Sequence, residues 1–359
     1  MQAPNPGWTR APWAGVPQPP TGSGGQSPAG AGGVDVDENS TWESFFHSTR
    51  DIVVGSDTFR VYLAGEWSSA APLLLFLHGA GYNALTWCCL VQQLLRQCDC
   101  RVAALVRTLP RHVLRGFSPH ALTRVSAQDL RGHGATLTQD DTDFSIERLV
   151  TDVVAVCDVI VPPDSPLVLV GHSMGGAVAS KAAAQLGDKL RGIVVVDCVE
   201  TAALDACPQM EVTVRARPHA FASARDALNW WVRSGASRSP AAARLSLLGQ
   251  LRDDYGQLVW RTDVALTIPH WRGWFSGQRD AFLSSTVPKL LLLSDARVLD
   301  APLQVAHMQG RFQLVVLPQA GHAIHEDAPG QASHAVAEFI RRFVRSEGKL
   351  PAVRDDHFC

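Results

Sequence analysis

The segment that most constrains this chain is a glycine-bounded turn, Gly171-His-Ser-Met-Gly175, set between an apolar run and a run of small residues. Residues 166–170 predict a buried β-strand, and residues 176–184 predict a helix that follows at once. The flanking glycines allow a tight turn, which holds Ser173 at the carboxyl end of the strand with its hydroxyl exposed beside a helix N-terminus. A serine that merely caps a helix needs no such strand before it. We therefore expect Ser173 to act as a nucleophile.

A second strand and loop lie upstream of this turn. Residues 73–77 are apolar throughout and predict a buried strand, which runs into His78-Gly-Ala-Gly81. A loop of this HGxG type places a backbone N–H against the reacting carbonyl. We expect the N–H groups of Ala80 and Met174 to form an oxyanion hole, which stabilises negative charge that develops only in the transition state. A glycine-rich turn without chemistry is the alternative interpretation.

A histidine follows the last apolar run of the chain. His322 lies in the loop after the strand expected at 314–317, and an amphipathic helix is expected over about 331–345. Nucleophile first and histidine last is the order of the α/β-hydrolase fold, a mostly parallel central sheet with helices on both faces. We assign the general base to His322 and expect His325 to shape the loop.

Two aspartates compete for the role of the triad acid. Asp295 follows the strand expected at 289–293, which is the position that the fold commonly gives to this carboxylate. Asp197 ends the strand expected at 192–196, directly after the helix that follows the nucleophile. Both positions lie at the carboxyl edge of the sheet, and both could reach Nδ1 of His322. Spacing alone favours Asp295.

Between these two strands the alternation of strands and helices gives way to helical patterns, clearest at 222–232 and 240–250. We expect an insert over about 200–286 to form a helical cap above the nucleophile. Most of its tryptophans should pack in the cap core, with one or two lining the cleft. The insert holds half of the chain's ten tryptophans: Trp230, Trp231, Trp260, Trp271 and Trp274.

The cap and its flanking segments also carry a closer resemblance, which covers roughly residues 42–345. It rests on Gly171-His-Ser-Met-Gly-Gly-Ala177, Val196-Asp-Cys-Val-Glu-Thr201, Trp271-Arg-Gly-Trp-Phe275, Met308-Gln-Gly310 and Leu317-Pro-Gln-Ala-Gly-His-Ala-Ile-His-Glu-Asp-Ala-Pro329. These strings resemble the protein phosphatase methylesterase family, whose cap motifs generic esterases do not share. The resemblance implies a serine esterase without cofactor or metal. Its implied substrate and partner is the methylated C-terminal leucine of the type 2A protein phosphatase catalytic subunit. Two alternatives stay open: a small-molecule carboxylesterase or lipase with the same triad, and a non-catalytic phosphatase-binding protein whose site the 106–128 segment has disrupted.

The resemblance also bears on the site residues. In that family the triad acid lies on the strand after the elbow helix, which implies Asp197 in place of Asp295. We expect Trp271 and Trp274 to form an apolar pocket for the leucyl side chain, with Arg131 or Arg272 at its rim, facing the acidic phosphatase tail. The alternative is that these tryptophans are cap core and the arginines are solvated.

Residues 106–128 depart from the family pattern. The family's Asp-Leu-Arg-x-His-Gly segment, here 129–134, normally follows its strand directly, and we expect that strand at 102–105. The residues between them include several arginines and no acidic residue. A basic surface loop and a retained in-frame intron both remain open. A second departure is that the cap lacks the acidic loop that some members carry after residues 253–255.

Composition limits the remaining possibilities. Lys and Arg number 32 against 34 for Asp and Glu, which argues against a nucleic-acid-binding surface. The eight cysteines form no disulfide framework and the histidines no metal-binding set, so we expect reduced thiols in the cytoplasm, with the nucleus as a second location. No apolar run approaches the roughly 18 residues of a membrane span. His78 and His172 are expected to pack and hydrogen-bond near the site.

Three segments are expected along the chain. Residues 1–40 are rich in Pro, Gly and Ser and predict a disordered tail. Residues 41–348 predict one hydrolase domain, and residues 349–359 a short C-terminal tail. We expect a monomer.

Overall fold

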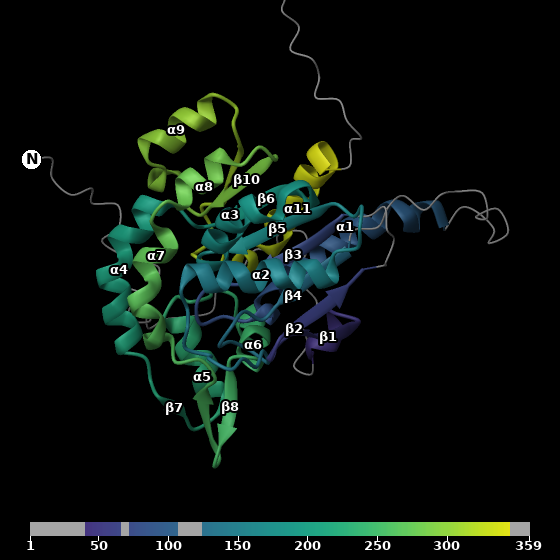
Figure 1. Cartoon of the computed structure of the whole chain (residues 1–359). Helices are drawn as coiled ribbons and strands as arrows, with labels where there is room; N and C mark the ends of the chain where they lie inside the picture. Colours follow the sequence, from purple (N-terminus) through teal and green to yellow (C-terminus); the bar gives the residue numbers. More distant parts are fainter. Residues whose placement is uncertain (1–39, 66–71, 107–123, 345–359) are drawn as a thin grey trace, which may run out of the picture.

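The computed structural model describes residues 40–65, 72–106 and 124–344 (Figure 1). For residues 98–106 it describes the backbone and not the side chains. Residues 1–39 of the expected N-terminal tail, the expected C-terminal tail, and residues 107–123 of the expected insert lie outside the described residues.

The described chain is built around an eight-stranded sheet in the order β1-β2-β4-β3-β5-β6-β10-β11 (Figure 1). β1 and β2 form an antiparallel hairpin, β2 pairs antiparallel with β4, and every later pairing is parallel. The strands are β1 (Ser48–Val54), β2 (Asp57–Ala64), β3 (Leu73–Leu77), β4 (Arg124–Gln128), β5 (Leu167–His172), β6 (Leu190–Val196), β10 (Lys289–Leu293) and β11 (Gln313–Val316).

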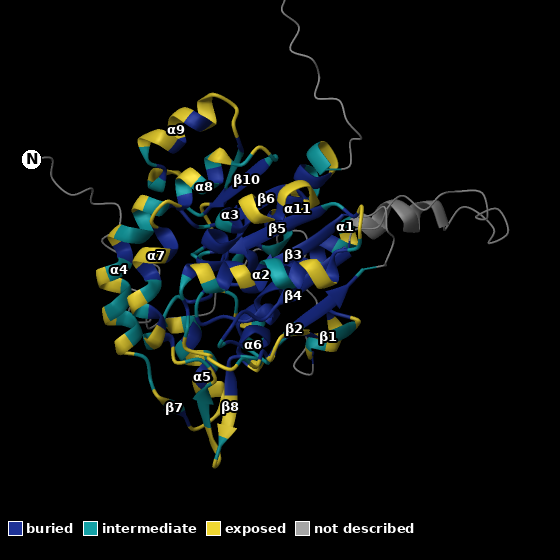
Figure 2. Cartoon of the chain, in the orientation of Figure 1, coloured by how far each residue is buried: buried dark blue, intermediate teal, exposed yellow. Residues whose placement is uncertain are grey.

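Helices cover both faces of this sheet, which is why its central strands are apolar without alternation (Figure 2). In β3, Leu73, Leu75 and Leu77 face one core, and Leu74 and Phe76 face the other. The first core contains residues of α2 (Ile146–Ile160), α3 (Met174–Leu186), α8 (Gln278–Ser284) and α9 (Ala301–Met308). The second contains residues of η3 (Ala84–Trp87), α1 (Cys88–Val106), α10 (Ile324–Asp327), α11 (Pro329–Phe339) and η8 (Ile340–Val344). Shorter turns are η2 (Trp42–Ser44), η5 (Gly187–Lys189) and η7 (Ala296–Val298). The expected fold class is confirmed.

The cap lies between β6 and β10 and is not purely helical. It consists of α4 (Glu200–Arg215), β7 (Ala220–Phe221), α5 (Ala224–Arg233), α6 (Pro240–Leu248), β8 (Leu251–Asp254), β9 (Gln257–Trp260), η6 (Val264–His270) and α7 (Trp271–Phe275). β7, β9 and β8 form a three-stranded antiparallel sheet, which the expectation of helices alone missed. Strands this short give little alternation, and the signal that could have found them is Tyr255-Gly256, where both residues take a positive φ and close a hairpin.

The expected insert needs correction at both ends. Residues 102–105 belong to α1 and not to a strand, because a short apolar run cannot by itself distinguish a strand from a helix. The strand that precedes the 129–134 segment is β4, which pairs with β2 on one side and β3 on the other. Buried polar residues, Ser126 and Gln128, disguise it in the sequence. Residues 124–128 are therefore an interior strand, and removing all of 106–128 would take it out of the sheet.

Candidate active site

Ser173 lies in a sharp turn that only this glycine pattern can form. β5 ends at His172, α3 begins at Met174, and Ser173 between them has φ 51° and ψ −117°. A Cβ on Gly171 would lie 2.1 Å from the backbone oxygen of Gly175, and a Cβ on Gly175 would lie 2.3 Å from that of Leu77. The backbones approach too closely for any side chain. A positive φ at a non-glycine residue is a strained conformation that folds retain mainly at functional sites.

Asp197 and His322 meet beside this turn. Asp197 directly follows β6, and its Oδ2 lies 2.8 Å from Nδ1 of His322, in the loop between β11 and α10. Its Oδ1 accepts hydrogen bonds from the backbone N–H and the hydroxyl of Ser294, at 2.9 and 3.0 Å. Asp295 instead pairs with the exposed Arg297 at 2.6 Å. The spacing-based preference for Asp295 does not agree with this geometry. Because Nδ1 of His322 faces Asp197, Nε2 is the ring nitrogen on the opposite side from the acid.

The two expected oxyanion donors are available. No hydrogen bond to another described residue uses the backbone N–H of Ala80 or of Met174. Ala80 lines the same pocket as Ser173 and His322, and Met174 is the first residue of α3, so its N–H is one of the free donors at a helix start. Both groups can therefore donate to a substrate oxygen.

Two neutral histidines hold the loop that carries Ala80. His78 donates through Nδ1 to the carbonyl of Gly79 and accepts the N–H of Leu130 at Nε2, and His133 donates to Arg131 and accepts from Gly81. Burial lowers the pKa of His133 to about 4 and that of His78 well below its ordinary value, so both rings stay neutral and can accept. Sequence reasoning did not single out His133. The signal was a second His-Gly pair after the neighbouring strand.

The remaining histidines support His322 from behind. The ring of His172 lies 4.6 Å from that of His322, and its Nε2 is 3.1 Å from the carbonyl oxygen of His322. His325 is buried against Trp87, with its Nε2 2.8 Å from the hydroxyl of Thr86. These contacts agree with the structural roles expected for His172 and His325.

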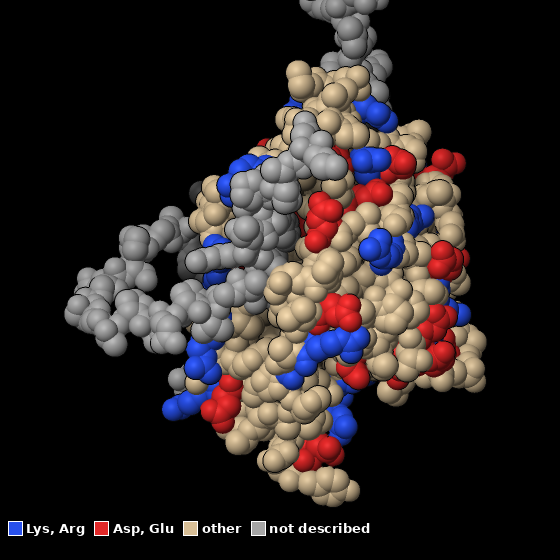
Figure 3. Space-filling model, turned by 90° about the vertical axis from the view of Figure 1, so that its left-hand side faces the viewer, with Lys and Arg blue, Asp and Glu red and all other residues tan. Residues whose placement is uncertain are grey.

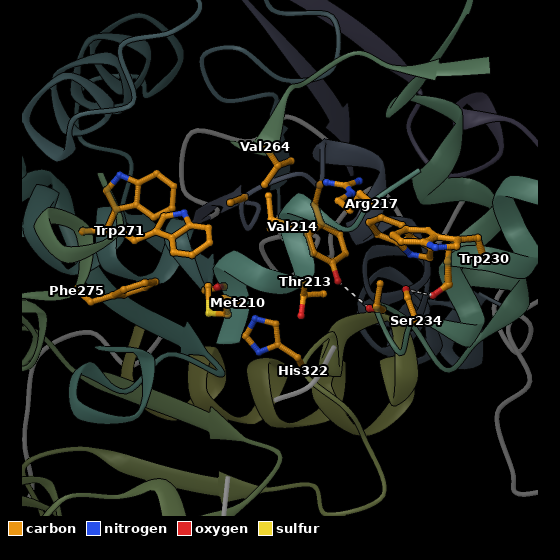
Figure 4. Close-up of a pocket in the computed structure, with 16 residues that line it drawn as sticks. Met210, Thr213, Val214, Arg217, Trp230, Ser234, Val264, Trp271, Phe275 and His322 are labelled. Carbon is orange, nitrogen blue, oxygen red and sulfur yellow. Dashed lines mark hydrogen bonds between the residues drawn. The ribbon is translucent and has the colours of Figure 1, made fainter. Parts of the chain in front are cut away.

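A pocket beneath the cap contains the site (Figure 4). It holds about 690 Å³ of empty space, including the part open to solvent. Trp271 and Trp274 line it, and both are also buried, with their indole N–H groups bonded to Thr267 and to the carbonyl of Phe144. They are cap core and pocket wall at once. In Figure 4, Trp271 and Phe275 lie on one side of His322, and Arg217 and Trp230 lie on the other.

The arginines expected at the rim are not where the sequence placed them. Arg131 is buried and pairs with Asp57 at 2.6 Å and Asp152 at 2.7 Å, so it ties β2 and α2 to the loop after β4. The resemblance carried no information on its burial. Arg272 is exposed on α7 and does not line the pocket. An arginine that does line the pocket is Arg217, which sequence reasoning missed.

Other classes of site were sought in the described residues. They contain no group of three or more His, Cys, Asp or Glu side chains that could hold a metal ion. Among the same residues, no helix has both the length and the apolar character needed to cross a membrane. On the face seen in Figure 3, basic and acidic side chains are interspersed.

Comparison with known proteins agrees with the fold. Residues 74–338 match the alpha/beta hydrolase family. The chain is 36% identical to protein phosphatase methylesterase 1 of Mus musculus, with 84% of each chain covered. It is 35% identical to the probable protein phosphatase methylesterase 1 of Caenorhabditis elegans, covering 87% of this chain and 80% of that one. Among solved structures, E-2-(acetamidomethylene)succinate hydrolase is similar with a TM-score of 0.62, at 23% identity over 82% of this chain and 99% of that one. An esterase of Mycobacterium tuberculosis is also similar, with a TM-score of 0.57 at 22% identity over 82% of this chain and 92% of that one.

Proposed function

The chain belongs to the protein phosphatase methylesterase family of α/β hydrolases, and we propose that it removes the methyl ester from the C-terminal leucine of a type 2A protein phosphatase catalytic subunit. The observation that carries this proposal is the hydrogen bond between Asp197 and His322, because His322 lines the same pocket as Ser173. These three side chains can serve as the orienting acid, the base and the nucleophile of ester hydrolysis.

The proposed reaction begins when Ser173 Oγ attacks the ester carbonyl and His322 Nε2 accepts its proton. Asp197 keeps the proton of the imidazole on Nδ1 and stabilises the imidazolium that forms. The N–H groups of Ala80 and Met174 bind the negative oxygen of the tetrahedral intermediate. His322 then protonates the departing methanol, and a water molecule hydrolyses the acyl-enzyme with His322 again as base. All of these steps use groups of the chain itself.

The pocket has an apolar side and a side that holds an arginine, and this arrangement supports a peptide substrate. Because the leaving group is only methanol, recognition must act on the acyl side of the ester. Trp271, Phe275 and Met210 line the pocket and provide an apolar wall of the size that a leucyl side chain needs. The remainder of a peptide can extend past His322 toward the side that holds Arg217 (Figure 4).

The experiment is to measure methanol release from the methylated phosphatase core by the wild-type protein and by Ser173→Ala. Turnover should fall at least 10³-fold, because the oxyanion hole and substrate binding alone leave only a small residual rate. Ser234→Ala is the matched control, since Ser234 lines the same pocket and its hydroxyl donates only to Trp231, and its activity should stay near wild type. If Ser173→Ala kept more than about 10⁻³ of the activity, another residue would be the nucleophile.

A further inference from the structure

Arg217 occupies an unusual place in the cap pocket. It lies two residues after the end of α4 and precedes Pro218, and it lines the pocket together with Ala80. The guanidinium carbon lies 3.9 Å from the ring centroid of Trp260 and 5.8 Å from those of Trp230 and Trp231. A Cβ on Gly81 would approach Nη1 to 3.3 Å, so the charge also lies against the oxyanion loop.

This charge forms no salt bridge among the described residues. Nε and Nη2 of Arg217 are shielded from solvent and form no hydrogen bond there, and Asp263 acts on the charge only through a longer-range electrostatic attraction. Burial lowers the pKa of Arg217 to about 10, which still leaves the guanidinium charged at neutral pH. The surrounding rings attract a cation, but they do not replace the anionic partner that a desolvated charge ordinarily has. The charge of Arg217 is thus available for a ligand in the pocket to neutralise.

The chemistry of the guanidinium points to the ligand. A guanidinium forms strong charge-assisted hydrogen bonds with carboxylate oxygens, and Nη1 of Arg217, which lines the pocket, is not among its shielded nitrogens. Arg217 lies on the opposite side of His322 from Trp271 and Phe275, which form the apolar wall (Figure 4). A peptide that placed its leucyl side chain against that wall could present a carboxylate to Arg217.

We propose that Arg217 determines specificity by binding a carboxylate of the peptide substrate. The inference rests on the proposed function for the identity of the substrate as a peptide chain end. The carboxylate has two possible sources with the same chemistry: an acidic side chain just before the esterified leucine, or the carboxylate that hydrolysis releases. The first source gives selectivity among substrates, and the second gives inhibition by the product.

Binding measured without turnover separates these sources. Fluorescently labelled peptides that end in leucine would be titrated into the Ser173→Ala protein. They differ in two features: Glu or Gln at either of the two positions before the leucine, and a C-terminal carboxylate or amide. We expect one carboxylate to tighten binding about 10-fold, the value of one charge-assisted pair of about 1.4 kcal/mol. Adding Arg217→Met should reduce that difference to less than about 2-fold, and Arg217→Lys should keep part of it because a point charge remains.

Two controls keep the result specific. Arg233→Met removes an exposed arginine of the same cap that does not line the pocket, and it should leave the preference intact. Hydrolysis of a short acyl ester by Arg217→Met in the Ser173 protein checks that the fold and the triad survive. The proposal is overturned if no carboxylate tightens binding, or if Arg217→Met and Arg233→Met change the preference equally. If a peptide carboxylate tightened binding but the wild-type protein hydrolysed no peptide methyl ester, the proposed function would be overturned and the role of Arg217 would stand.

Discussion

The loops at the carboxyl edge of the sheet and the cap above them use their polar groups in opposite ways. At the sheet edge, Asp197 uses both carboxylate oxygens, and His78 and His133 use both ring nitrogens, in bonds within the protein. In the cap pocket, Arg217 leaves two N–H groups without a described partner. Catalysis needs fixed geometry, so the groups that hold Asp197 and the Ala80 loop are bonded within the protein, whereas recognition needs a charge that a ligand can neutralise.

Two arginines make the same contrast with one kind of side chain. Arg131 is buried between Asp57 and Asp152 and fastens the edge loops to the core. Arg217 is half-buried among tryptophans that carry no charge to neutralise it. An arginine held between two carboxylates serves the fold, whereas one that is desolvated without a salt bridge is open to an anionic ligand.

The largest expected effect tests the internal bonding of the sheet edge at Asp197. Asp197→Asn should lower kcat about 10⁴-fold, because the amide favours the wrong imidazole tautomer of His322. Asp295→Asn, which breaks only a surface pair with Arg297, should change kcat less than about 2-fold. Initial rates with a short acyl ester give both values. The reverse ranking would return the acid to Asp295.

The next effect tests the close backbone packing of the same edge. Gly175→Ala should lower the free energy of unfolding by about 4 kcal/mol, because its Cβ would meet the backbone of Leu77 and His78. Gly273→Ala on α7 is the control, since its Cβ would meet nothing within 4 Å and should leave the fold as stable or slightly more so. Urea unfolding measures both changes. Equal stability of the two variants would mean that the elbow is not packed as described.

Low pH should destabilise the folded protein through the buried histidines at the sheet edge. The pKa of His133 is about 4 in the folded protein and about 6.5 in the unfolded chain, so only the unfolded chain takes up this proton between those values. The free energy of unfolding should therefore fall as the pH falls from 6.5 to 4, by about 3 kcal/mol for this residue.

Urea unfolding across that pH range provides the measurement. His133→Gln keeps an acceptor for Gly81 but no longer titrates, so its slope should be lower by about 1.4 kcal/mol per pH unit. His219→Gln, at an exposed histidine, should keep the wild-type slope. An unchanged slope in His133→Gln would show that this ring is not held neutral.

The smallest effect concerns the outer surface of the cap. Arg272 is exposed and outside the pocket, so it can act only on a protein that covers the cap. Arg272→Ala should lower kcat/KM for the methylated phosphatase about 3-fold and leave a short acyl ester unaffected. Parallel losses on both substrates would argue against a docking role.

Much of the fold could be predicted because its signals are local. The glycines around Ser173 and the continuous apolar runs of β3, β5 and β10 are consequences of backbone geometry and burial on both faces. β4 could not be placed in the same way, because its alternate residues are polar yet buried, and the apolar residues 102–105 looked like a better strand.

The site was less accessible to the same reasoning. Spacing favoured Asp295, although both aspartates follow strands that end at the same edge, and only the resemblance favoured Asp197, which the structure places beside His322. Arg131 was misplaced and Arg217 was missed for a related reason. Whether an arginine is neutralised depends on carboxylates far away in sequence, such as Asp57 for Arg131, and no local pattern reports them.

The bond between His322 and Asp197 spans 125 residues, and this has a consequence for how activity appears during synthesis. A ribosome adds about 5–20 residues per second, so His322 is translated roughly 6–25 seconds after Asp197, and Ser173 is translated earlier still. A nascent chain carries its nucleophile long before it can hydrolyse anything. Esterase activity thus reports the arrival of the loop after the last strand, and nascent chains on stalled ribosomes should show no activity until β11 has docked beside β10 and His322 has emerged behind it.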